Sequence, residues 1–393
     1  MGKIDELIQQ YCPDGVGYVQ LGEVCEVLTG GEAPDNAIKG KEPIGDCKYP
    51  IYSNGIGENA LWGYAPTFRI SKTSITFSSI GTIGFPTIRE CCYTPIIRLK
   101  VIYPKDDTVL NVYFLKYVLE IVEFEKQKSS VPNINANMIK SISIPLPPLP
   151  VQEAIVNILD RFAVYAAELQ AELQARQQQY NYYRDTLLSF EGREDVQWVK
   201  LGDVADLLSG FPFDSTQFTN AGVRLMRGVN IKRGQLCFNE NDDRYWKSIT
   251  GLEKYIVEEN DIVISMDGSL VGKSFGMVKK EHLPLLLVQR VARIRSSVFN
   301  INFIYHCINN WFPNYVDKKK TQGAIPHISM KDIANFTIPS PSLEEQGKIA
   351  NILDRFDTLV NNLSQGLPAE IEARQQQYEY YRDQLLTFKR KEA

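Results

Sequence analysis

The stretch VQEAIVNILDRFAVYAAELQAELQARQQQYNYYRDTLLSF, residues 151–190, carries a regular stripe of apolar and aromatic side chains. Its members are spaced four and three residues apart in alternation, which is the heptad pattern of a helix that packs lengthwise against another helix. One continuous helix over these residues would be roughly 60 Å long at ~1.5 Å per residue, more than a compact domain of ordinary size needs internally. The pattern therefore predicts a long spacer helix.

A second stripe of the same kind lies in residues 349–388. The interval between Phe356 and Arg374 is four residues longer than the matching interval between Phe162 and Arg176. It contains Gly366 and Pro368, which predict a kink or a helix restart. The two stripes can bury each other as an intramolecular antiparallel coiled coil, although an ordinary helical-bundle core is the alternative. The predicted seam consists of Leu159, Phe162, Leu169, Leu173, Tyr180, Tyr183, Leu187, Leu353, Phe356, Tyr378, Tyr381 and Leu385.

The whole chain is a tandem duplication. YVQLGEVCEVLTG (18–30) matches WVKLGDVADLLSG (198–210), and RQQQYNYYRDTLLSF (176–190) matches RQQQYEYYRDQLLTF (374–388). A third block, SSVPNINANMIKSISIPLPPLPVQEAIVNILDRF, matches GAIPHISMKDIANFTIPSPSLEEQGKIANILDRF near the end of the second half. The stretches between these blocks, about 31–128 and 211–322, show little similarity. Each half is thus a variable body framed by a repeated scaffold.

The variable bodies read as mixed, strand-rich domains. Short apolar runs between turn residues, at 74–80, 261–266 and 291–296, predict strands, and residues 111–126 predict a helix. We therefore predict an α+β fold in which two strand-rich mixed domains are joined by two long antiparallel helices, with the pseudo-twofold symmetry of a tandem duplication. The predicted boundaries are 1–150 for the first strand-rich domain, 151–194 for the first spacer helix, 195–341 for the second strand-rich domain and 342–393 for the second spacer helix.

Composition narrows the class of protein. The 393 residues are 44% apolar and 23% charged, which is ordinary for a globular chain, and no apolar run approaches ~18 residues. The start, MGKIDELIQQ, lacks the apolar core of a secretory signal, so a cytoplasmic location is expected. The seven cysteines include no C-x-x-C spacing, so we expect reduced, mostly buried thiols and no metal site.

The sequence contains partial matches to catalytic motifs but no complete motif. DIVISMDGSLVGKS (261–274) imitates a phosphate-binding loop, yet Asp267 stands where the first glycine is needed, so a glycine turn between strands is the better interpretation. Pro13-Asp14 followed by Asp46 and Lys48 imitates a nuclease pattern only distantly. An adenine methyltransferase motif is missing, and three histidines stand isolated from any hydrolase elbow. We predict no catalytic residue.

Charge resolved by region points to nucleic acid instead. The net charge of −4 divides into +5 over residues 211–341 and −9 over the remainder. Lysine and arginine contact phosphates, and Arg, Asn and Ser side chains read base edges, although such charges can also form a merely solvated face. The predicted DNA-binding residues are Ser53, Asn54, Lys126, Lys128, Ser129, Arg224, Arg227, Lys232, Lys273, Arg290, Lys318, Lys319 and Lys320.

With its doubled domain exits IPLPPLPVQEAIVNILDRF and IPSPSLEEQGKIANILDRF and its repeated RQQQY helices, the chain resembles the specificity subunit of a type I restriction-modification system. The resemblance spans essentially the whole chain. It implies two target recognition domains that each read one half of a bipartite double-stranded DNA site. It also implies a subunit without a catalytic centre, with two methylation subunits docked on the seam helices and restriction subunits joining them. S-adenosylmethionine, ATP and Mg²⁺ would then act in those partners.

Two other classes of protein stay open at this point. A coiled-coil adaptor that binds only proteins would show no salt-dependent affinity for duplex DNA. A stand-alone DNA-binding regulator would bind a specific duplex without a methyltransferase.

Overall fold

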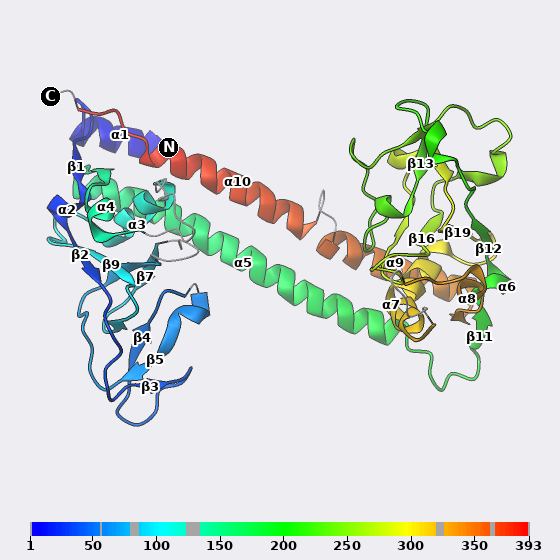
Figure 1. Cartoon of the computed structure of the whole chain (residues 1–393), viewed down its shortest axis with the longest axis horizontal. Coiled ribbons are helices and arrows are strands. Elements are labelled where there is room, and N and C mark those ends of the chain that lie inside the picture. Colours follow the sequence, from blue (N-terminus) through cyan, green and yellow to red (C-terminus); the bar gives the residue numbers. More distant parts are fainter. Residues whose placement is uncertain are drawn as a thin grey trace. The chain divides into compact units, whose positions relative to one another are not determined.

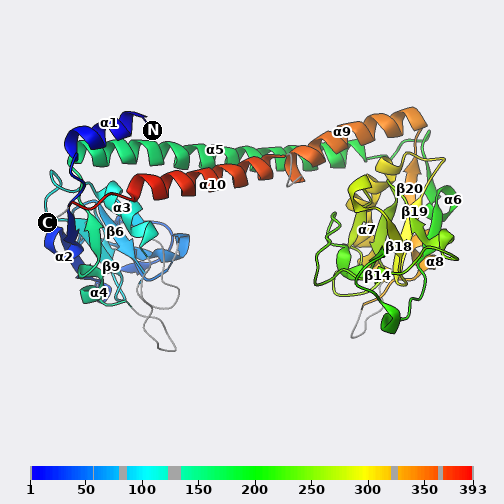
Figure 2. The same cartoon turned by 90° about the horizontal axis from the view of Figure 1, so that it is seen from above.

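The computed structural model describes residues 2–55, 57–78, 86–122, 134–319, 326–361 and 366–391. The chain divides into two compact units, each made of a body and parts of the long helices (Figures 1 and 2). The first unit contains Met1–Gln170 and Ile371–Ala393, and the second contains Ala171–Glu370. None of the helices in the described ranges combines the length and the apolar character needed to cross a membrane.

The helices follow the heptad prediction closely. Helix α5, Leu149–Leu187, runs for 39 residues, so the predicted continuous spacer helix is confirmed. The second copy is instead two helices, α9 (Leu343–Asn361) and α10 (Leu367–Leu386). Pro368 is the second residue of α10, in the first turn where its missing N–H costs no hydrogen bond. The predicted restart is therefore confirmed.

In the first unit the beginning of α5 packs against α10. The Phe162 ring lies 5.5 Å from the Tyr381 ring and 6.4 Å from that of Tyr378, while Leu159 is buried in the same cluster as Leu385. Since residues later in α5 contact residues earlier in α10, the two helices run antiparallel. The helix that closes the second half of the sequence thus completes the core of the first unit.

The second unit has a similar arrangement, in which the other end of α5 packs against α9 in place of α10. The end of α5 packs against α9, with the Tyr183 ring stacked on Phe356 at 5.2 Å and the Tyr180 ring 6.5 Å from Phe356. Leu173 and Leu187 pack against the cluster that holds fully buried Leu353. Leu169, the remaining seam residue, is half-buried. Each unit therefore combines a helix from one half of the sequence with a helix from the other.

The first body contains two four-stranded sheets and a short helix. One sheet has the order β2-β9-β6-β7 and is antiparallel, and the other has the order β3-β5-β4-β8 with a parallel pair between β4 and β8. Helix α3 (Val112–Ile121) packs on the first sheet. The strands are β2 Cys25–Thr29, β3 Ile38–Lys39, β4 Tyr49–Tyr52, β5 Leu61–Ala65, β6 Ser74–Phe77, β7 Thr87–Arg89, β8 Thr94–Pro95 and β9 Lys100–Pro104.

The second body repeats the strand order of the antiparallel sheet, but in its other sheet the parallel pair lies at the centre instead of at one edge. Its sheets have the orders β12-β19-β16-β17 and β14-β13-β18-β15, and again one pair, β13 with β18, is parallel. Helix α7 (Ile301–Lys319) takes the place of α3. The strands are β12 Asp206–Ser209, β13 Val223–Met226, β14 Tyr245–Trp246, β15 Ile256–Val257, β16 Ile262–Ser265, β17 Phe275–Met277, β18 Leu285–Leu287 and β19 Val291–Arg295. The two bodies therefore share a backbone plan that their sequences do not reveal.

A buried glutamine ties each body to its helix. Gln152 in α5 accepts a hydrogen bond from the backbone N–H of Asn111 at 2.8 Å and donates to the Pro147 carbonyl at 2.7 Å. Gln346 in α9 makes the same two bonds, from the Asn300 N–H at 3.0 Å and to the Pro341 carbonyl at 2.9 Å. Both amides are almost fully buried. The repeated scaffold thus preserves a polar joint as well as an apolar seam.

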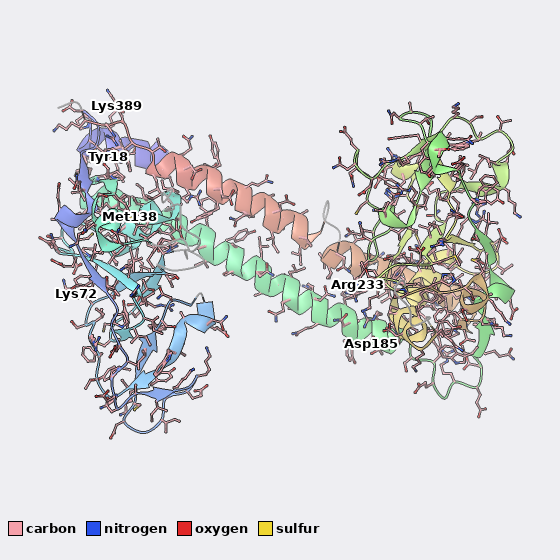
Figure 3. All side chains as sticks on the ribbon, viewed as in Figure 1. Tyr18, Lys72, Met138, Asp185, Arg233 and Lys389 are labelled. Atoms are coloured by element: carbon pink, nitrogen blue, oxygen red, sulfur yellow. The ribbon has the colours of Figure 1, made fainter. Side chains whose placement is uncertain are left out.

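Two-stranded ribbons and the chain ends complete the units. Strand β1 (Tyr18–Gln20) pairs with β10 (Ser143–Pro145), and β11 (Gln197–Lys200) pairs with β20 (Thr337–Ser340). After helix α1 (Gly2–Tyr11), the Val16 N–H donates to the Lys389 carbonyl at 2.8 Å. Figure 3 labels Tyr18 and Lys389 in this region. The chain's two ends therefore meet in the first unit. The remaining short helices are α2 Leu21–Val24, α4 Ala136–Lys140, α6 Leu201–Val204 and α8 Met330–Ala334.

Candidate nucleic-acid interface

Three chain segments meet at one edge of the second body. Because β13 and β18 run parallel, their carboxyl ends reach the same edge of the sheet, where the Val288 N–H donates to the Met226 carbonyl at 3.1 Å. The loop that follows β16 meets them there, since a Cβ atom at Gly228 would lie 2.8 Å from the Ser265 hydroxyl. The edge is thus made of residues that follow β13, β16 and β18.

These segments, together with residues that follow β12, line a hollow of about 600 Å³. Its wall combines aromatic rings, hydroxyls, an amide, a carboxylate and three basic side chains. This mixture suits a polar ligand with flat apolar faces. The lining residues are Phe213, Ser215, Phe218, Arg227, Gly228, Val229, Ile231, Lys232, Ser265, Asp267, Gly268, Ser269, Leu270, Ser274, Val288, Gln289 and Arg290.

The charged groups of the hollow are held in place by neighbours. The Arg290 guanidinium donates to the Asp267 carboxylate at 2.8 Å, and the arginine side chain stays 66% exposed. Arg227 donates to the Asp242 carbonyl at 3.0 Å, and its guanidinium lies 5.9 Å from the Phe218 ring centre. Fixed but accessible guanidinium groups of this kind are suited to binding nucleic acid.

Three of the predicted DNA-binding residues, Arg227, Lys232 and Arg290, come together in this hollow. Lys273 is half-buried in the loop that follows β16. Arg224 has internal partners, because its guanidinium pairs with Asp243 at 3.2 Å and lies 4.8 Å from the Phe238 ring centre. The positive charge counted in this region is thus divided between accessible and internally paired groups.

Two of the predicted lysines lie outside this hollow. Lys318 and Lys319 are exposed at the end of α7. Other predicted residues lie outside the described residues, namely Lys126, Lys128, Ser129 and Lys320.

In the first body, Ser53 and Asn54 occupy the matching edge. Strand β4 is parallel to β8, and the Ile96 N–H donates to the Tyr52 carbonyl at 2.9 Å, so Ser53 is the counterpart of Arg227. The Ser53 hydroxyl donates to the Ala60 carbonyl at 3.5 Å, and the Asn54 amide donates to the Ile97 carbonyl. Both side chains therefore bond to the backbone of their own body.

A tight turn follows β8 and β18 in the two bodies, at residues 96–99 and 288–291. Its outer residues are buried and its middle two are exposed in both copies. Ile97, Arg98 and Arg290 have left-handed backbone angles, with φ of 52°, 58° and 64°. Only one other non-glycine residue among those described, Asn260, has a positive φ. Such angles are uncommon for residues other than glycine, and a β-branched residue such as Ile97 is a clear outlier.

Each turn rests on a glycine that the sequence repeat preserves. The Gly30 N–H donates to the Leu99 carbonyl at 2.7 Å, and the Gly210 N–H donates to the Val291 carbonyl at 3.0 Å. A Cβ atom would lie 2.8 Å from the Ile96 nitrogen at Gly30 and 2.2 Å from the Val288 oxygen at Gly210. No other residue type fits so close to the turn backbone, which explains the glycine that ends both LTG and LSG.

Lys100 lies just beyond the turn of the first body. It is 7% exposed, and its ammonium donates to the Thr29 hydroxyl at 2.9 Å. Burial lowers the pKa of this lysine, and the nearby charge of Arg98 lowers it further. The counterpart position in the second body is Ala292, which pairs with Ser209 as Lys100 pairs with Thr29. The first body therefore has a buried lysine behind its turn where the second body has an alanine.

Sequence reasoning missed Asp267, Gln289 and the turn residues of the first body. No local pattern gives a backbone angle or a pairing between distant loops. One signal was available, because aligning KVIYP (100–104) with VARIR (291–295) as the same strand brings Arg98 close to the position of Arg290. The glycine loop at 267–274 was interpreted correctly, since it joins strands β16 and β17.

A protein with two bodies of one plan and different surfaces, set on repeated helices, belongs to the class that presents two separate recognition surfaces. Comparison with known proteins gives that class a family. The family described as Type I restriction modification DNA specificity domain matches residues 13–176 and again 193–373, so the chain belongs to it. Its function is therefore DNA sequence recognition in a type I restriction-modification system.

Individual relatives agree. The chain is 34% identical over 314 residues to a specificity subunit of type I restriction enzymes from Escherichia coli, covering 75% of each chain. It is 26% identical over 371 residues to a putative type I specificity subunit of Mycoplasma pneumoniae, covering 93% of this chain and 96% of the relative. In fold it is similar to the crystal structure of a type I system S subunit from M. genitalium, with a TM-score of 0.64, 15% identity and coverage of 95% and 96%.

Proposed function

We propose that the chain is a non-catalytic subunit that reads a bipartite double-stranded DNA site, one half-site with each body. It would act in a complex with methylation and restriction subunits. S-adenosylmethionine, ATP and Mg²⁺ would serve the chemistry of those partners. One observation carries the proposal. The repeated scaffold is alike in both halves of the chain, whereas the two bodies share a backbone plan but differ in their surface side chains.

The hollow of the second body supports contact with DNA in particular. Arg227 and Lys232 supply positive charge for phosphates, and the half-buried Phe218 supplies an aromatic ring. Arg290 and Gln289 add side chains of the types that bind guanine and adenine edges in two-pronged hydrogen bonds. A surface that bound only proteins would not need this combination at one edge of the second body.

Side chains that are both repeated and exposed point to the partner subunits. Buried repeats are explained by packing, but Tyr182 is 67% exposed and its counterpart Tyr380 is 59% exposed. Each tyrosine is followed two residues later by an Arg-Asp pair, Arg184 with Asp185 at 2.8 Å and Arg382 with Asp383 at 2.7 Å. Figure 3 labels Asp185 on α5. We name these two places, around Tyr182 and Tyr380, the tyrosine patches.

One patch lies in each unit, so two copies of one partner fit this arrangement better than one copy. Two identical methylation subunits would each bind one tyrosine patch. Aromatic side chains with a polar tip are the type most often found at the centre of protein interfaces.

A docking experiment tests this stoichiometry. Tyr182→Ala and Tyr380→Ala, each made in the chain produced together with its methylation subunit, should each release one partner, and the double variant should release both. Native mass spectrometry measures the composition. Val164→Ala is the matched control, because Val164 is 57% exposed on the same helix and its counterpart is Thr358. Unchanged stoichiometry in the double variant would contradict the tyrosine patches.

Sequencing of methylated bases tests the DNA-reading function. A host that expresses this chain with its methylation subunits should carry methyl groups at one two-part motif with an unread spacer. Affinity for a duplex carrying that motif should fall steeply with salt, because phosphate contacts release counterions. Methylation without any two-part motif would refute the proposal, and salt-independent retention of DNA would refute the phosphate contacts.

A further inference from the structure

We propose that the exposed residue pairs Ile97-Arg98 and Gln289-Arg290 read base edges, one pair in each half-site. We name the two segments that carry them, residues 96–99 and 288–291, the reading turns. The inference rests on the proposed bipartite DNA function and adds the residues that determine specificity. It also states that one structural position does this work in both bodies.

The two reading turns are equivalent in position and in burial. Each follows the strand that pairs in parallel, and each carries the buried, exposed, exposed, buried sequence of side chains. The Ile97 N–H donates to the Gly31 carbonyl at 2.8 Å, and the Gln289 N–H donates to the Phe211 carbonyl at 2.8 Å. The two bodies have little sequence similarity, yet their turns share the same backbone hydrogen bonds. They also share an arginine at the same position, Arg98 in one and Arg290 in the other.

The arginine of each reading turn has a left-handed backbone conformation. A left-handed angle costs a residue with a Cβ atom roughly 1–2 kcal/mol, and glycine or asparagine would relieve most of it. Neither stands at Arg98 or Arg290, where φ is 58° and 64°. Strained residues that persist at exposed positions cluster at binding and catalytic sites, because the side chain is needed where the backbone places it.

The charge on Arg290 is shared with a neighbouring carboxylate. Arg290 is paired with the Asp267 carboxylate at 2.8 Å, which neutralises most of its charge and repels a phosphate. The pairing leaves other guanidinium N–H groups to donate and fixes the plane in which they lie. Neutral acceptors such as guanine O6 and N7 suit such a group better than phosphate does. Phosphate contact is left to Arg227 and Lys232 on the same wall.

The residue before the arginine supplies the difference between half-sites. Gln289 can donate to and accept from one adenine edge, whereas Ile97 can contact only an apolar group such as the thymine methyl. Ile97 is 54% exposed, and the Asn54 amide holds its carbonyl. An exposed, β-branched residue at a positive φ has no packing reason to be there.

The test uses the complete complex of this chain with its methylation subunits. Gln289→Ala should relax the motif at a position of one half-site and leave the other half-site unchanged, and Ile97→Ala should do the reverse. Arg290→Ala and Arg98→Ala should weaken binding to the specific duplex by about 10- to 100-fold, the range expected for loss of a two-pronged base contact. Arg290→Lys keeps the charge but loses the fork, so it should also relax the motif. The readouts are methylated-base sequencing and duplex affinity.

Lys331→Ala, which removes an exposed charge from helix α8 of the same unit, is the control and should change neither readout. An unchanged motif in Arg290→Lys together with weakened binding in Arg290→Ala would make Arg290 a phosphate contact and overturn the base-reading role.

Two further outcomes separate the reading turns from the proposed function. If all the turn variants keep the motif and the affinity, and the wild-type complex still methylates a two-part motif, only the role of the reading turns is overturned. A wild-type complex without a two-part motif would instead refute the proposed function. Gln289→Ala and Arg290→Lys keep the turn backbone, so they decide the matter if an alanine at Arg290 fails to fold.

Discussion

The two units hold their bodies with the same helix residue but with different partners. In the first unit the Tyr117 hydroxyl donates to the Asp160 carboxylate at 2.6 Å. In the second, the matching Asp354 contacts His306 at 2.8 Å and accepts from the Asn302 amide at 2.6 Å. The helix side of the contact is repeated, whereas the body side has changed.

The difference teaches where each half is free to vary. Side chains of the frame, such as the two buried glutamines and the two aspartates, are shared because each must fit both a helix and a body. Side chains at the edges of the sheets are constrained only by the ligand that binds there. Ser53 can therefore occupy the position that Arg227 occupies in the other body. Recognition can therefore change without disturbing assembly.

The largest expected effect comes from replacing one body outright. Exchanging residues 31–128 for the same segment of a relative should replace the first half-site completely and leave the second unchanged, because each body has its own core and its own edge. Sequencing of methylated bases in cells that express the chimaera with the methylation subunits measures this. A change in both half-sites would show that the bodies do not read independently. The reciprocal exchange of residues 211–322 is the control and should replace only the second half-site.

The next largest effect is on stability. Gln346→Leu should lower the free energy of unfolding by roughly 2–5 kcal/mol, because it leaves the Asn300 N–H and the Pro341 carbonyl buried without their partner. Gln152→Leu should do the same to the first unit. Urea unfolding followed by circular dichroism gives the values.

Gln376→Leu provides the matched control, because this glutamine is exposed on α10. It should change stability by less than about 0.5 kcal/mol. Equal effects of Gln346→Leu and Gln376→Leu would mean that the buried amide joint does not hold body to helix. A loss in only one of the two buried variants would mean that the units are less alike than their hydrogen bonds indicate.

The frame could be predicted from sequence because its physics is local and repeated. Heptad spacing indicated α5, and the glycine and proline at 366 and 368 indicated the restart before α10. The partner exchange between helices followed from the need to bury two seams. The common plan of the bodies could not be predicted in this way, since backbone hydrogen bonds carry it and the side chains differ.

The candidate site was predictable only in part, for a related reason. Composition and charge led to Arg227, Lys232 and Arg290, which do lie together in the hollow. They led equally to Arg224, whose charge is met by Asp243, because a sequence does not show which charges are paired inside. Gln289 and Ile97 carried no signal, since nothing in their neighbours marks a turn with left-handed angles.

A smaller effect tests the strain in the reading turns. Arg290→Gly should raise the free energy of unfolding of the second unit by up to about 1 kcal/mol, since glycine adopts the observed φ of 64° without cost. The same change should weaken DNA binding, so stability and affinity should move in opposite directions. Arg290→Ala separates the two terms, because alanine keeps the strain and loses the side chain. If the glycine variant is no more stable than the alanine variant, the turn stores no strain.

The smallest expected effect separates the two units by their response to pH. All three histidines lie in the second unit, and the His282 ring accepts a hydrogen bond from the Lys279 N–H at 3.0 Å through Nδ1. Burial lowers the pKa of His282 below its ordinary value. The nearby charge of Glu281 opposes this with a smaller effect, and the charges of Lys279 and Arg224 lower the pKa further.

The unfolded chain therefore takes up a proton that the native second unit resists, and the stability of that unit should fall as pH drops from about 7 to 5. The first unit contains no histidine. Hydrogen exchange at pH 5 and pH 7 should show the loss near η5 (Lys280–His282). This loss of protection should be absent in His282→Asn, because an amide oxygen can accept the same hydrogen bond without titrating. Equal losses of protection in both units would assign the pH dependence to carboxylates instead.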